Sequence, residues 1–228
     1  GVEAGQTDQT NYGFKDTNGN PLLGVKQAEV NFKVNVYPVA DEATLKVGQV
    51  VGYEDAGRNT DKNVQDKDGT IKHPGNGIKL PIEVTSTDKD GSETFTVTIK
   101  DIPNGGAIFV KEPLTGKDIL VTYAEDGTPT LEVWKDGKVD GAYTGTTIKA
   151  GTGTITIEKY DNVNPPKFIP PHNAHGDFDL KIDAKTVDTA TINGNTVTTE
   201  NPTVTDKVIT VVVKDVADSV VWNKYNEE

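Results

Sequence analysis

The chain has 228 residues, a formal net charge of −12, 23 glycines and 12 prolines, and it contains neither cysteine nor methionine. So acidic a chain argues against binding to nucleic acids or to anionic membranes, and the lack of cysteine excludes disulfides and cysteine nucleophiles. No apolar run approaches the roughly 18 residues of a membrane-spanning helix, so we expect no membrane insertion.

Short alternating segments, separated by turns rich in Gly, Pro, Asn and Asp, follow one another along most of the chain. Thr and Val are abundant, and no segment keeps a helical period for long, as is typical of strands. The expected strands are residues 43–51, 78–86, 93–102, 107–112, 118–125, 130–136, 153–160 and 177–187, followed by a closing pair. This order of strands and turns predicts an all-β fold, an antiparallel β-sandwich.

A sequence repeat brackets this series of strands. VNFKVNVYPVAD at Val30–Asp41 matches VITVVVKDVAD at Val208–Asp218, so that the tripeptide Val-Ala-Asp recurs 177 residues later. An Asn-Gly turn precedes each copy, at Thr17–Asn20 and at Ile192–Asn195, and such turns are strong hairpin signals. A long period with the same order of features predicts tandem modules.

The repeated Val-Ala-Asp sets the expected domain boundaries. Residues 1–40 are expected to be the closing strands of a preceding or split β-sandwich module, residues 41–218 one β-sandwich module, and residues 219–228 the start of the next module or a linker. A seven-stranded sandwich needs only about 100 residues. We therefore expect residues 126–160 to be an inserted hairpin region and residues 53–76 a long loop, and loops of this size often carry function.

The densest group of carboxylates precedes the strand expected at residues 93–102, in the segment TDKDGSET. Calcium takes roughly six to eight oxygen ligands, which acidic residues alternating around a glycine can supply. Other carboxylates follow the first strand, close the repeat and end the strand after this segment. Because strand ends and loops can meet at one end of a sandwich, we expect them to converge on calcium. The predicted ligands are Asp41, Glu54, Asp55, Asp88, Asp90, Glu93 and Asp101.

Two other interpretations of these carboxylates stay open. On so acidic a chain, the same segment is also compatible with a solvated turn. A catalytic pair of carboxylates requires that one pKa be raised selectively, and no pocket-forming aromatic residues stand beside the segment. No Ser-His-Asp arrangement is suggested by the sequence either, so we expect no enzymatic activity.

Four segments together resemble a known protein family. They are residues 80–109 (LPIEVTSTDKDGSETFTVTIKDIPNGGAIF), residues 52–57 (GYEDAG), residues 165–188 (PPKFIPPHNAHGDFDLKIDAKTVD) and residues 211–218 (VVVKDVAD). They are similar to the Ig-like, cadherin-like modules of giant repeats-in-toxin (RTX) adhesins of Gram-negative bacteria. The resemblance covers most of residues 38–218, but residues 126–160 are longer than a plain spacer module requires.

The resemblance implies an Ig-like or cadherin-like β-sandwich in a chain that is secreted to the bacterial cell surface. It also implies that calcium at the junctions with neighbouring modules of the same chain stiffens a rod that serves adhesion and biofilm formation. The alternative is that this module itself binds a ligand, a peptide or protein and less readily a glycan.

Aromatic residues of the inserted region are the candidate ligand-binding residues. Trp134 and Tyr143 flank its turns, and Tyr123 lies just before it. Aromatic side chains on a hairpin offer a large contact area at a low entropic cost. The alternative is that these rings pack in the core.

A histidine pair is the candidate for a transition metal. His172, His175 and Asp177 have a spacing that suits zinc. A zinc site needs further fixed ligands, and the alternative is an ordered surface turn that leads into the next strand.

Overall fold

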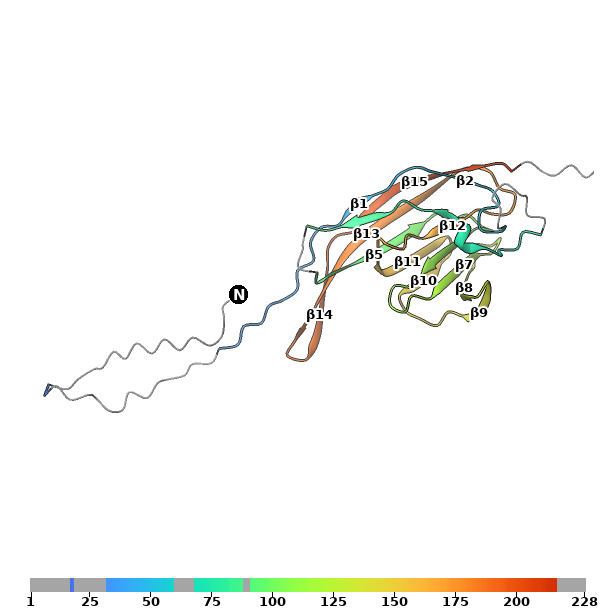
Figure 1. Ribbon diagram of the computed structural model, residues 1–228. Helices are drawn as coiled ribbons and strands as arrows, with labels where there is room; N and C mark the ends of the chain where they lie inside the picture. The colour runs from blue at the N-terminus through green and yellow to red at the C-terminus, as the bar shows by residue number, and fades with distance from the viewer. Residues whose placement is uncertain (1–16, 19–31, 60–67, 88–90, 217–228) are drawn as a thin grey trace, which may run out of the picture. The chain divides into compact units, whose positions relative to one another are not determined.

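A computed structural model describes residues 17–18, 32–59, 68–87 and 91–216 (Figure 1). The chain divides into two units, Gly1–Val36 and Tyr37–Glu228, which are considered separately. In the first unit, residues 17–18 lie in a turn, and residues 32–36 have no regular secondary structure. The rest of the closing strands predicted for residues 1–40, and the predicted start of a next module at 219–228, lie outside the described residues.

The second unit is built from strands, with one short 3₁₀ helix, η1 (Pro74–Asn76). The strands are β1 (Thr44–Lys46), β2 (Val50–Tyr53), β3 (Ile78–Lys79), β4 (Glu83–Thr85), β5 (Glu93–Lys100), β6 (Ala107–Lys111), β7 (Asp118–Tyr123), β8 (Pro129–Lys135), β9 (Lys138–Ala142), β10 (Ile148–Gly151), β11 (Thr154–Tyr160), β12 (Lys167–Ile169), β13 (Gly176–Ile192), β14 (Asn195–Glu200) and β15 (Val204–Lys214). The predicted all-β class is therefore confirmed.

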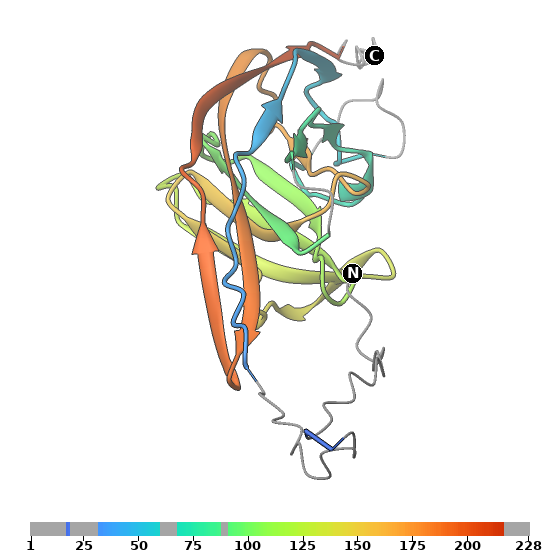
Figure 2. The same ribbon diagram turned by 90° about the vertical axis from the view of Figure 1, so that its left-hand side faces the viewer.

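The strands form two main sheets and a small β1–β4 pair. The first sheet has the order β10-β11-β5-β13-β15-β2, with β14 also paired to β13, and the second has the order β3-β12-β6-β7-β8-β9. Within the described residues every pairing is antiparallel except that of β2 with β15, which is parallel. The long strands β13 and β15, orange to red in Figure 2, run side by side through the first sheet.

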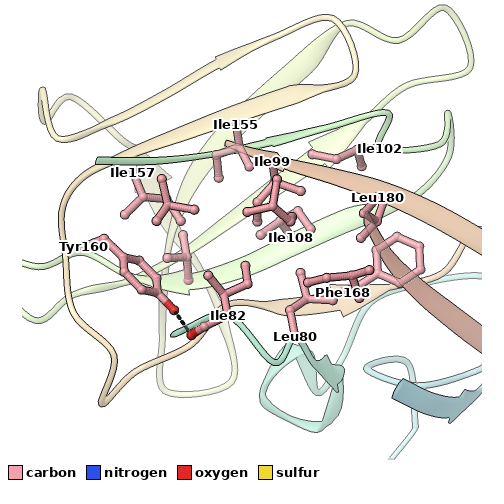
Figure 3. Close-up of a cluster of buried hydrophobic side chains, with 14 of the residues drawn as sticks. Leu80, Ile82, Ile99, Ile102, Ile108, Ile155, Ile157, Tyr160, Phe168 and Leu180 are labelled. Atoms are coloured by element: carbon pink, nitrogen blue, oxygen red, sulfur yellow. Dashed lines mark hydrogen bonds between the residues drawn. The ribbon is translucent and has the colours of Figure 1, made fainter. Parts of the chain in front are cut away.

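The core lies between the two sheets, where alternate residues of each strand point inward. Ile99 of β5, Ile155 of β11 and Phe168 of β12 are among its fully buried side chains (Figure 3). At the edge of the core the hydroxyl of Tyr160 donates a hydrogen bond to the carbonyl oxygen of Ile82, at 3.0 Å. Two sheets packed through such a core form the sandwich that the alternating sequence predicts.

Residues 126–160 supply strands to both sheets. The β8–β9 hairpin extends the second sheet next to β7, whereas β10 and β11 join the first sheet next to β5. Ile155 and Ile157 of β11 are buried in the core between the sheets. The region expected as an insertion is thus built into the sandwich itself.

A second, smaller apolar cluster lies on the outer face of the second sheet. Its buried members are Ala107, Leu120 and Ile169, and Ile71, Phe109 and Trp134 pack against them. Part of the long loop predicted at residues 53–76 reaches this face, because Ile71 belongs to the cluster.

The buried guanidinium of Arg58 anchors the loop at residues 53–76 to the rest of the unit. It donates hydrogen bonds to the carbonyl oxygens of Gly69 and of Pro170, the latter at 2.8 Å. Gly57 has φ +87° and lies so close to Ile169 that a Cβ would stand 2.8 Å from its side chain, so glycine is required there.

Candidate metal and ligand sites

The first group of carboxylates surrounds the first Val-Ala-Asp and is called here the Asp41 end, made of Asp41, Glu93 and Asp188. The backbone N–H of Asp41 donates to Glu93 Oε1, and the backbone N–H of Val39 donates to Asp188 Oδ2 at 3.0 Å. Thr87 Oγ1 donates to Asp41 Oδ2 at 2.8 Å. The structure thus brings together Asp41 and Glu93, two of the predicted calcium ligands.

The charges at the Asp41 end repel one another. Glu93 of β5 stands directly opposite Asp188 of β13 in the antiparallel register, and like charges in this position destabilise a sheet. Asp188 is only 6% exposed, and Glu93 Oε2 is buried without a hydrogen-bond partner in the described part of the chain. Because a buried carboxylate oxygen is costly unless it is compensated, this arrangement suits a cation.

A second group, called here the Glu54 end, is made of Glu54, Asp55 and Asp215. Glu54 is 6% exposed and its Oε1 accepts the backbone N–H of Val216 at 2.9 Å. Asp55 is fully buried. The Nδ1 atom of His175 lies 3.6 Å from Glu54 Oε2 and 3.4 Å from Asp215 Oδ1.

The two groups lie at opposite ends of β13. Gly176, at the start of this strand, pairs with Val213 beside the Glu54 end, whereas Asp188 pairs with Glu93. At about 3.3 Å per residue, roughly 40 Å of strand separates the two positions. The predicted convergence of all the carboxylates on one site is therefore not found.

The remaining predicted metal ligands lie elsewhere. Asp101 has φ +60° and forms an ion pair with Lys181 at 3.0 Å. Asp88 and Asp90 lie outside the described residues. Among the residues that the structure describes, no group of three or more His, Asp or Glu side chains is placed to hold one metal ion. This includes the zinc candidates His172, His175 and Asp177.

The three aromatic candidates do not share one surface. Tyr123 is 2% exposed, its hydroxyl donates to the carbonyl oxygen of Thr154 at 2.7 Å, and burial raises its pKa. Tyr143 also packs against the core between the sheets. Trp134 packs against the outer cluster instead, so that only this ring is placed on the outer face of the second sheet.

The hydroxyl of Tyr143 belongs to a polar network. It lies 3.1 Å from Thr147 Oγ1, which donates to the buried carboxylate of Glu112. Thr115 also donates to Glu112, at 2.6 Å from its backbone nitrogen. Burial acts to raise the pKa of Glu112, but the hydrogen bonds from Thr115 and Thr147 outweigh it and lower the pKa.

Sequence reasoning missed two residues of these ends. Asp188 is 95 residues away from Glu93 in the chain, and only the register of β5 with β13 reveals that the two are neighbours. Asp215 lies within the repeat, but the position that matches it in the first copy is Pro38, so the repeat itself does not mark Asp215 as a ligand. Asp215 could have been found from its position directly before the second Val-Ala-Asp, where a junction site is expected.

Comparisons with protein-family models, with curated proteins and with solved structures found no match to this chain. In the part of the chain that the structure describes, no helix has the length and apolar character needed to cross a membrane.

Proposed function

We propose that this chain is a non-catalytic, calcium-stabilised extracellular module of a bacterial RTX adhesin, a rigid extender that serves cell-surface adhesion and biofilm formation. One observation carries the proposal. Val39 and Val216 are equivalent positions of the repeat, and the backbone N–H of each donates to a buried carboxylate, Asp188 at the Asp41 end and Glu54 at the Glu54 end.

This equivalence supports a calcium site at the junction of two successive modules, in which each module contributes carboxylates from one of its ends. A single Val-Ala-Asp between two such modules lies within reach of the Glu54 end of the first and of the Asp41 end of the second. Together the two ends provide the several carboxylate oxygens that calcium requires. In a single chain the Asp41 end still brings Asp41, Glu93 and Asp188 together, so calcium also stabilises the single chain, through this weaker partial site. A calcium ion there also offsets the repulsion between Glu93 and Asp188.

Removal of calcium tests the proposal. We expect the melting temperature of the chain, measured by calorimetry, to fall by roughly 5–10 °C when excess EDTA replaces calcium, because a ligand of the folded state alone stabilises that state. Calcium should restore the original value and magnesium should not, since magnesium demands a smaller, octahedral site. An unchanged melting curve in EDTA would contradict the proposal.

Removing the two facing charges should abolish most of the stabilisation by calcium. In the double variant Glu93→Gln, Asp188→Asn, both backbone N–H groups keep an acceptor while the repulsion disappears. Without calcium this variant should be more stable than the original chain by about 0.2–1 kcal/mol, and with calcium it should be less stable. Urea titrations in both conditions measure the two differences.

The matched control is Glu125→Gln, Asp140→Asn, which removes the same number of charges from exposed positions. This control should keep the full calcium response. A double variant at the Asp41 end that responds to calcium as strongly as the control does would place the ion elsewhere.

The alternative proposal is a ligand-binding module of the same adhesin. The observation that favours it is the position of Trp134 on the outer face of the second sheet, next to Phe109. Among the three predicted aromatic residues, it is the ring that a ligand on this face would meet.

A further inference from the structure

The outer face of the second sheet carries an unusual row of side chains. In the antiparallel registers, Lys79 of β3 stands opposite Lys167 of β12, Lys167 opposite Phe109 of β6, and Phe109 opposite Leu120 of β7. Facing residues of paired strands project from the same side of a sheet. Two lysines and an aromatic ring are thus aligned across three neighbouring strands.

The facing lysines lack compensation. Like charges directly opposite each other destabilise a sheet, and no carboxylate in the described residues forms an ion pair with Lys79 or Lys167. The ammonium group of Lys167 donates to the carbonyl oxygen of Gly75 instead. A chain of net charge −12 has many carboxylates that would serve as partners, so two uncompensated lysines side by side stand out.

In another pair of facing lysines, the positive charges are neutralised by nearby carboxylates. Lys100 of β5 stands opposite Lys181 of β13 in the first sheet. Lys100 forms ion pairs with Asp183 at 3.0 Å and with Asp206 at 2.6 Å, and Lys181 pairs with Asp101 at 3.0 Å. Here the chain supplies its own counter-charges, which it does not do for Lys79 and Lys167.

The surface around the uncompensated pair is hollowed. A hollow of about 530 Å³ is lined by Lys79, Lys111, Phe109 and Lys167, among others, and a neighbouring hollow of about 660 Å³ shares Lys79 with it. Lys111 pairs with Asp118 at 2.8 Å. None of the carboxylates of the Asp41 end or of the Glu54 end lines either hollow.

A second aromatic ring continues this surface. Trp134 of β8 stands opposite Asp118, and Asp118 opposite Lys111, one row along from Phe109. Phe109 and Trp134 are both half-buried and pack against the same apolar cluster around Leu120. The surface therefore combines lysines with two partly exposed rings, and it is called here the Lys79 face: Lys79, Lys111, Lys167, Phe109 and Trp134.

We propose that the Lys79 face binds an anionic glycan, one that bears carboxylate groups on its sugar rings. The lysines pair with the carboxylates, and the rings of Phe109 and Trp134 pack against the apolar faces of the sugars. This inference is independent of calcium at the module junctions.

The position of the face on a sheet favours a glycan over an acidic peptide. An extended peptide gains affinity by adding its backbone to the free edge of a sheet. Lys167, Phe109, Lys111 and Leu120 lie on β12, β6 and β7, which are interior strands whose edges are both paired. Of the Lys79 face, only Lys79 lies on an edge strand, β3, which has two residues and is too short for a peptide backbone to pair along. Lysines around aromatic rings suit a ligand whose own rings carry the charge.

Hexagalacturonate is a suitable probe, measured by calorimetric titration in low salt with EDTA present, so that no cation bridges the two molecules. We expect saturable binding that weakens as salt is raised. Neutral cellohexaose should not bind. The double variant Lys79→Gln, Lys167→Gln should weaken the binding of hexagalacturonate by about tenfold or more, whereas Lys100→Gln, Lys181→Gln should leave it unchanged.

A third variant separates a glycan from other polyanions. Phe109→Leu keeps an apolar side chain in the cluster but removes the ring, so it should weaken the binding of hexagalacturonate and leave that of hexaglutamate unaffected. Circular dichroism confirms that each variant is folded. The inference is overturned if the full chain does not bind hexagalacturonate, if the Lys79, Lys167 variant binds it as well as the original, or if hexaglutamate binds as tightly as the glycan.

Discussion

Replacing Phe168 with alanine is expected to lower the free energy of unfolding by about 3–5 kcal/mol. The ring is 0% exposed, and its centroid lies 5.7 Å from that of Phe178. Phe168 lies on β12, between β3 and β6, so its loss leaves a cavity in the core between the two sheets. Since single domains are stable by only about 5–15 kcal/mol, this one substitution removes a large share of the total. Urea unfolding followed by fluorescence measures the change.

Tyr37→Ala is the control, because it removes an aromatic ring of the second unit from a position that is 64% exposed. It should change the free energy of unfolding by no more than about 0.5 kcal/mol. A loss of several kcal/mol from this control, or a loss below about 1 kcal/mol from Phe168→Ala, would contradict the core described for the second unit.

Replacing Arg58 with alanine is expected to destabilise the chain by about 2–6 kcal/mol, because two carbonyl oxygens lose a charged donor, at a cost of about 1–3 kcal/mol each. The substitution leaves the carbonyl oxygens of Gly69 and Pro170 without the guanidinium that now donates to them. It also removes a positive charge near the fully buried carboxylate of Asp55, three residues earlier in the chain. Thermal unfolding followed by calorimetry checks the result.

Lys72→Ala provides the comparison for Arg58. Lys72 belongs to the same loop region and pairs with Asp68 at 2.9 Å, but both side chains are largely exposed. Exposed pairs of this kind contribute about 0–1 kcal/mol, so this variant should melt close to the original chain. If the two variants are equally stable, the buried guanidinium does not anchor the loop.

The strands with a strict alternation could be predicted from the sequence. The segment 93–102 alternates apolar and polar residues, and β5 (Glu93–Lys100) lies within it. β12 (Lys167–Ile169) could not be predicted, because three residues between two proline pairs are too short to show a period. β9 (Lys138–Ala142) is exposed throughout, so burial leaves no pattern in its sequence.

The candidate sites were less predictable than the strands, because they depend on register. The proximity of Asp41 to Glu93 was predicted, since strand ends and loops can meet at one end of a sandwich. The distance of Glu54 from Asp41 was not, because it follows from the length of β13 and from the pairing of β2 with the far end of β15. Likewise Lys79 and Lys167 are 88 residues apart in the chain, and only the β3–β12 pairing makes them neighbours.

The pairing of β13 with β15 has a mechanical consequence. Near the start of the second unit, Asp41 is held at one end of β13, and β15 ends at Lys214, beside the other end of β13. Tension applied through these two points acts along the strands, at right angles to the hydrogen bonds that join them. The bonds between β13 and β15, from the Gly176–Val213 pair to the Ala184–Val204 pair, then bear the load together rather than opening one after another. A unit with this geometry resists unfolding when it is pulled along its strands. Each domain of a protein tether that is stretched between two surfaces under flow needs this resistance.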